Sequence, residues 1–168
     1  MVGDALWYEA AMVVGITNAL NVVADGLGPV MTAVKDGDAE VAAAYADIRA
    51  FYGGAEVPLA FGLAAHDPGY LVDLWTAVKR AFTDNALGRR LKTALAFAVS
   101  LTTRSAFGTA WHLGEMRRLG VGERGVIEVV GVTQMFSSYT KIADTLQLEP
   151  DMGHIAPVDP TPAPGGER

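Results

Sequence analysis

The segment from Asp67 to Phe82 constrains the fold most, because a helix start signal is followed there by a helical apolar stripe. Asp67 is a good N-cap acceptor and Pro68 suits the first turn of a helix. The four residues Leu71, Leu74, Trp75 and Val78 then follow at positions i, i+3, i+4 and i+7, on one face of a helix. An amphipathic helix of this kind must pack against other elements, so the segment predicts a buried helix ending near Phe82.

Similar signals recur along the chain and predict an all-α protein. We predict six further helices, over 5–24, 39–52, 58–65, 87–102, 105–119 and 123–146, the last of them kinked near Gly131. The first should end at Asp25-Gly-Leu-Gly-Pro29 with a left-handed glycine cap, and Asp38 should cap the second. The helix over 87–102 is the most apolar, and we expect its buried face to consist of Leu91, Leu95, Ala98 and Leu101.

The length and composition indicate a single globular domain followed by a tail. Of the 168 residues, 51% are hydrophobic and 19% are charged, which is typical of a folded chain. We assign residues 1–148 to one helical domain, with a leading helix over 1–28 and a full repeat over 38–148. Five of the eight prolines lie in the segment 149–168, which we therefore predict to be a flexible tail.

Charge and hydropathy argue against two classes of partner. The net charge of -6 disfavours nucleic acid, whose phosphates are bound mainly by Lys and Arg. The two arginine doublets, Arg89-Arg90 and Arg117-Arg118, are expected on solvated helix faces. No apolar stretch is predicted to reach the roughly 18–20 residues of a membrane span, since polar residues interrupt the longest candidate, 10–24. With an acidic rather than a basic residue near the start, the chain is expected to be cytoplasmic and without a membrane partner.

The chain contains no cysteine, and this excludes several chemistries. Disulfides, thiolate nucleophiles and cysteine-ligated metals all require a thiol. The three histidines His66, His112 and His154 are scattered and form no pair with metal-ligand spacing. We therefore expect neither a metal nor another cofactor.

An internal similarity links the first predicted helix to the last. The segment 17–27 aligns with 136–146 at a constant offset of 119 residues, with Ala24/Ala143, Asp25/Asp144 and Leu27/Leu146 identical.

The segment Ser105-Ala-Phe-Gly-Thr-Ala-Trp-His112 resembles the signature of the alkylhydroperoxidase-D-like, or carboxymuconolactone decarboxylase, superfamily. That signature is a Cys-x-x-Cys-x-x-x-His run after an apolar helix, and residues 87–148 resemble its surroundings as a whole. The resemblance implies an orthogonal helical bundle. Here Ser105 and Gly108 stand in place of the two cysteines and only His112 remains, so thiol peroxidase activity is excluded.

A second stretch, over 41–82, resembles the group I 2-haloacid dehalogenases. The similarity rests on Tyr45-Ala-Asp-Ile-Arg49, on Val57-Pro-Leu-Ala-Phe61 and on Leu63-Ala-Ala-His-Asp-Pro-Gly-Tyr-Leu71 with Trp75. It implies a small organic acid as substrate and an acidic residue that activates water, a role we carry over to Asp47.

These resemblances give six candidate site residues. Asp47 and His112 are the catalytic candidates, and Tyr45, Arg49, Ser105 and Trp111 are the candidates for substrate binding. Asp47 would be a stronger base in a closed apolar pocket, where desolvation raises its pKa; the alternative is a surface or helix-pairing carboxylate. Being two residues apart, Asp47 and Arg49 should point to different helix faces. His112 could act as a base near Ser105, or be an interior histidine without a third catalytic partner.

Two functional hypotheses follow. The first is a dehalogenase-like enzyme that acts on a small organic acid by activated water or general-base catalysis. The second is a catalytically silent scaffold or accessory subunit. The resemblance implies a homo-oligomer under both hypotheses.

Overall fold

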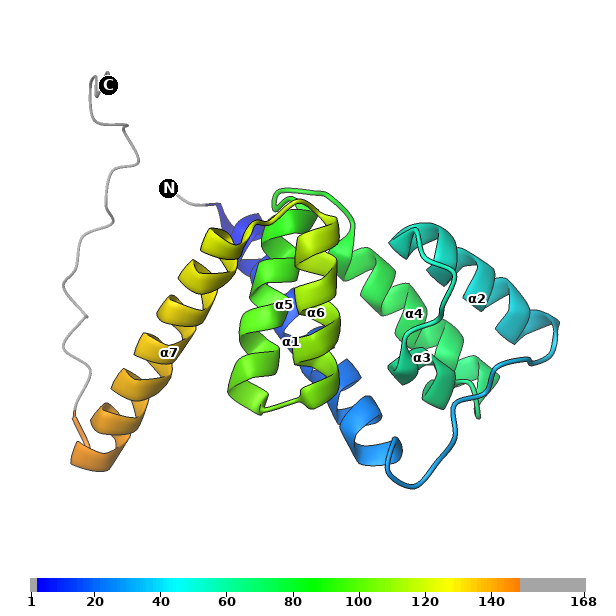
Figure 1. The fold of residues 1–168 in the computed structure, drawn as a ribbon, viewed down its shortest axis with the longest axis horizontal. Coiled ribbons are helices and arrows are strands. Elements are labelled where there is room, and N and C mark those ends of the chain that lie inside the picture. Colours follow the sequence, from blue (N-terminus) through cyan, green and yellow to red (C-terminus); the bar gives the residue numbers. More distant parts are fainter. Residues whose placement is uncertain (1–2, 149–168) are drawn as a thin grey trace, which may run out of the picture.

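The computed structural model describes residues 3–148, and in that range the chain forms seven helices joined by short loops (Figure 1). The predicted tail, 149–168, lies outside the described residues. The helices are α1 (Asp4–Leu27), α2 (Ala39–Tyr52), α3 (Leu59–Ala64), α4 (Pro68–Phe82), α5 (Arg89–Thr103), α6 (Ala106–Arg118) and α7 (Glu123–Leu146). The prediction of an all-α fold is confirmed, and most helix bounds agree within two residues.

Several predicted caps are present. Asp38 accepts hydrogen bonds from the backbone N–H groups of Glu40 and Val41, both at 3.0 Å. Asp67 accepts one from the N–H of Tyr70 at 3.1 Å, with Pro68 in the first turn of α4. Gly53 ends α2 in the left-handed conformation, with φ of 66°. The side chains of Asp38 and Asp67 satisfy backbone donors that a helix start leaves free.

The predicted end of α1 is wrong in its details. The helix continues through Asp25 to Leu27, and its C-cap Gly28 is right-handed, with φ of -54°. The N–H of Gly28 still bonds to the carbonyl of Ala24 at 3.0 Å. The chain therefore leaves α1 without a left-handed turn, and the helix ends two residues before Pro29.

Helix α1 lies at the centre of the bundle, where it contacts α3, α4, α5 and α6. Helices α2 and α3 pack on α4 at one side, and α5 and α6 form a hairpin at the other (Figure 1). The sequence prediction that no stretch is long enough to span a membrane is wrong by length and composition, because α1 meets both criteria. Its apolar side chains Val13 and Leu20 are completely buried in the bundle core, whereas Trp7, Tyr8 and Val22 are more than 60% exposed.

The predicted buried face of α5 is also wrong. The buried residues are Lys92, Thr93, Ala96, Phe97 and Ser100, whereas Leu91 is 51% exposed. The side of α5 that meets α1 is more polar than the side we expected. Lys92 pairs there with Glu9 of α1 at 3.1 Å, and Ser100 accepts a hydrogen bond from Asn21. The leucine side faces α7 instead, across a shallow apolar groove of about 270 Å³.

Candidate functional site

The hydroxyl of Ser105 caps α6. Ser105 is the N-cap residue, is only 2% exposed, and its Oγ accepts a hydrogen bond from the N–H of Gly108 at 2.9 Å. His112 lies seven residues further along the same helix, or about 10 Å at 1.5 Å per residue. No hydrogen bond joins these two side chains, so they form no serine–histidine pair.

Gly108, which stands where the signature that this chain resembles has its second cysteine, is covered by the side chain of Asn21 from α1. A Cβ built on Gly108 would overlap Oδ1 of Asn21 and Oγ of Ser100. The Asn21 amide is held there because its Nδ2 donates to Ser100 Oγ at 3.2 Å and to Thr103 Oγ1 at 3.1 Å. Ser100 in turn donates to the carbonyl of Ala96 at 2.9 Å. A packed polar network therefore occupies the space that a second cysteine side chain would need.

His112 is a buried, uncharged side chain. It is 2% exposed and lies nearly parallel to the rings of Phe82 and Trp111, with centroids at 6.1 and 5.3 Å. Burial lowers its pKa to about 4, because a charged imidazole would lose its hydration. Its Nε2 has no hydrogen-bond partner, and neither has Thr17 Oγ1 on α1. His112 is present where the family signature has its histidine, but with a pKa that makes it a weak base at neutral pH.

Asp47 forms a polar bridge between α2 and α4. Both of its carboxylate oxygens lie 2.8 Å from Lys79 Nζ, and Trp75 Nε1 donates to Oδ2 at 2.8 Å. The hydrogen bond from Lys79, followed by that from Trp75, holds the pKa of Asp47 below its usual value. The side chain is 43% exposed. The closed apolar pocket that would raise its pKa is absent around Asp47, and the alternative of a helix-pairing carboxylate fits the contacts.

Tyr45 and Arg49 line an open groove of about 680 Å³ between the loop before α2 and the loop after it. Both side chains bind the loops. The Tyr45 hydroxyl donates to the carbonyl of Val34 at 2.7 Å, and Arg49 Nε donates to that of Ala55 at 2.9 Å. Asp47 does not line this groove, which confirms that it and Arg49 point to different faces of α2.

Trp111 belongs to an aromatic cluster, where its ring lies 5.1 Å from that of Tyr52 and 5.2 Å from that of Phe107. It also lines a neighbouring groove of about 440 Å³, together with Glu115 and Arg118. His112 and Trp111 stack on each other, and the other candidates lie in separate places: Ser105 at a helix cap, Asp47 in an ion pair, and Tyr45 and Arg49 in a groove. The structure does not gather them around one substrate position.

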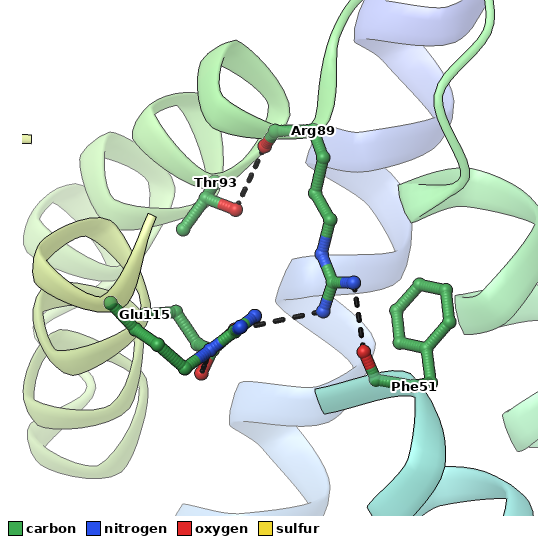
Figure 2. A network of polar contacts seen from close by, with 5 residues as sticks. Phe51, Arg89, Thr93 and Glu115 are labelled. Carbon is green, nitrogen blue, oxygen red and sulfur yellow. Dashed lines mark hydrogen bonds and ion pairs between the residues drawn. The ribbon is translucent and has the colours of Figure 1, made fainter. Parts of the chain in front are cut away.

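Sequence reasoning missed a buried charge network that joins α2, α5 and α6 (Figure 2). Arg89 donates from Nη1 to the carbonyl of Phe51 at 2.8 Å, and its guanidinium lies 4.0 Å from the centre of the Phe51 ring. Its Nη2 is 3.6 Å from Glu115 Oε2, and Arg118 binds both oxygens of the same carboxylate at 2.7 and 2.8 Å.

The side chain of Arg89 is only 17% exposed, so the prediction that the Arg89-Arg90 doublet lies on a solvated face is wrong for Arg89. The Glu115 carboxylate pairs with two arginines and so joins α5 to α6. Because both of its oxygens are engaged, it is not available as a general base. Among residues 3–148, no three His, Asp or Glu side chains come together in a way that could hold a metal ion.

Comparison with known proteins agrees with the fold. No family model matches this sequence, and no curated protein sequence does. A solved structure, the alkylhydroperoxidase AhpD core from Rhodospirillum rubrum, superimposes with a TM-score of 0.67. It is 24% identical in sequence, and the match covers 73% of this chain and 95% of that one. The chain therefore has the AhpD-like all-α fold and lacks any cysteine.

Proposed function

We propose that this chain is a catalytically silent protein of AhpD-like fold that acts as an assembly or accessory subunit. The observation that carries the proposal is the packing at Gly108. The side chain of Asn21 and the hydroxyl of Ser100 fill the position of the second cysteine, and Ser105 at the first position is used as a helix cap. A site that had merely lost its thiols would leave room for a substrate there.

The remaining polar candidates support the same proposal. His112 is neutral and buried, and Asp47 is paired with Lys79 and accepts a hydrogen bond from Trp75. A general base needs both access to a substrate proton and a pKa near the working pH. Neither residue combines the two.

One observation favours the competing hypothesis of an enzyme for small organic acids. Arg49 and Tyr45 line the largest of the grooves described above, and an arginine there could bind a carboxylate. The groove lacks Asp47, so such an enzyme would need another base, and the carboxylates that border it are Asp36 and Glu56. Dehalogenase-like catalysis through Asp47 therefore has little support in this arrangement.

The proposal is tested by assaying the purified full-length chain against two sets of substrates. The first is peroxides with a dithiol donor, and the second is 2-halo and 2-hydroxy acids with halide release or acid consumption as readout. We expect no turnover above a control without protein. Turnover on an acid that disappears in Arg49→Ala but persists in the exposed control Arg124→Ala would overturn the proposal in favour of the enzyme hypothesis.

A further inference from the structure

Helix α7 is the least buried helix of the fold. None of its 24 residues is buried. Its first half rests on α5, and Figure 1 shows the second half diverging from the rest of the bundle. A short helix is only marginally stable alone in water, and helices in proteins are stabilised mainly by packing an apolar face. This half of α7 therefore requires a partner surface.

A regular apolar stripe runs along this half of α7 and begins at Val132, where the helix still lies against α5. Val132, Met135, Tyr139, Ile142 and Leu146 follow one another at spacings of three and four residues, which places them along one side of a helix. Their exposed fractions lie between 52% and 63%. No charged residue belongs to the stripe. A pattern with this repeat is typical of a helix that packs lengthwise against another helix.

The same pattern is buried elsewhere in this chain. At the offset of 119 residues that relates the two ends of the sequence, the stripe corresponds to Val13, Ile16, Leu20, Val23 and Leu27 of α1. Val13 and Leu20 are completely buried, Val23 is 8% exposed, and the other two pack against the core. One stripe is therefore covered by its own chain, and its counterpart on α7 is not.

We infer that the α7 stripe binds the α7 stripe of a second copy of this chain. The stripe is uncharged and apolar, so two copies are complementary to each other, as a symmetric dimer interface must be. The groove between α5 and α7, lined by Leu91, Leu95 and Val129, continues the apolar surface at Val132.

The available surface is large enough for such pairing. Nine large apolar side chains between Ile127 and Leu148 are exposed, and five of them form the stripe. At roughly 100 Å² each, the five present on the order of 500 Å² of apolar surface. An interface of standard size buries about 800 Å² per partner, of which about 60% is apolar. This inference deepens the proposed function, because an assembly subunit needs a surface through which it assembles.

Light scattering of the full-length chain at micromolar concentration tests the inference. We expect the mass of a dimer or a higher closed oligomer, and a shift toward the 17.7 kDa monomer in Met135→Glu and Ile142→Glu, with dissociation constants raised at least tenfold. Thr140→Glu places the same charge on an exposed position of the same helix off the stripe, and should leave the mass unchanged. Circular dichroism should show that the stripe variants remain helical.

The absence of native cysteine allows a second, independent measurement. Tyr139→Cys lies in the middle of the stripe and should form a disulfide-linked dimer on mild oxidation, whereas Thr140→Cys should not. A monomeric wild-type chain, or an oligomer whose mass the stripe variants do not change, would overturn the inference. Turnover by the wild type would refute the proposed function without changing these masses, so the two failures are distinguishable.

Discussion

The side chain of Asn21 lies against the backbone of Gly108, with its Cγ 2.9 Å from the point where a Cβ on residue 108 would stand. The two residues are on α1 and α6, 87 positions apart in sequence. Any side chain at position 108 would therefore overlap a residue of a different helix. Glycine is the residue that leaves room for the Asn21 amide at this place.

Gly108→Ala is therefore expected to destabilise the protein by about 1–3 kcal/mol, because the added methyl group overlaps Asn21 and Ser100. The matched control is Gly114→Ala on the same helix, where a Cβ meets nothing within 4 Å. Replacing that glycine should stabilise by up to about 1 kcal/mol, since alanine is the better helix former. Urea unfolding curves measure both changes. In the background Asn21→Ala the cost of Gly108→Ala should shrink, and an unchanged cost would contradict the contact.

Asp47→Asn is expected to lower the free energy of unfolding by no more than about 1 kcal/mol. The ion pair with Lys79 is partly exposed at both ends, 45% and 43%, and such pairs contribute little. Asparagine can still accept the hydrogen bond from Trp75. Asp73→Asn, an exposed carboxylate on α4, is the control and should change stability by less. A gain in stability would instead indicate a desolvated carboxylate, as the enzyme hypothesis requires.

These two positions show how far the sequence could lead. Start signals such as Asp67-Pro68 act within a few residues of chain, so helix bounds were predictable, and the signature around Ser105 was enough to indicate the fold. The partners of Asp47 and of Gly108 lie 28 and 87 positions away, and no local pattern predicts which residue faces them. Apolar spacing likewise did not show that the side of α5 with Lys92 and Ser100 meets α1, since that depends on the packing of the whole bundle. Leu91 was therefore assigned to the wrong side.

His112 should make stability depend on pH between about 6.5 and 4. Its pKa is about 4 in the folded protein and near 6.5 when unfolded, so the unfolded chain binds more protons in this window. The contribution is fully present above pH 6.5 and is lost as the pH falls, by about 3 kcal/mol in all.

Unfolding curves of wild type and His112→Gln at several pH values measure this loss. The variant should have a nearly flat profile from pH 6.5 to 5. Carboxylates with lowered pKa, such as Asp47, lose their contribution only at lower pH, as the pH passes through their own range. Equal slopes for wild type and variant between pH 6.5 and 5 would show that His112 is not a neutral buried group.

The arginine network predicts a large difference between two chemically identical substitutions. Arg89→Met should destabilise by about 2–4 kcal/mol, because it removes the partly buried hydrogen bond to the carbonyl of Phe51 and the stacking on its ring. Arg117→Met should cost about 0.5 kcal/mol or less, since its partner Glu123 is 73% exposed and solvent screens the pair. Both variants lose one positive charge, so net charge cannot explain a difference between them. If chemical denaturation gave the same loss of unfolding free energy for both variants, the contacts of Arg89 with α2 and α6 would contribute no more to stability than an exposed ion pair.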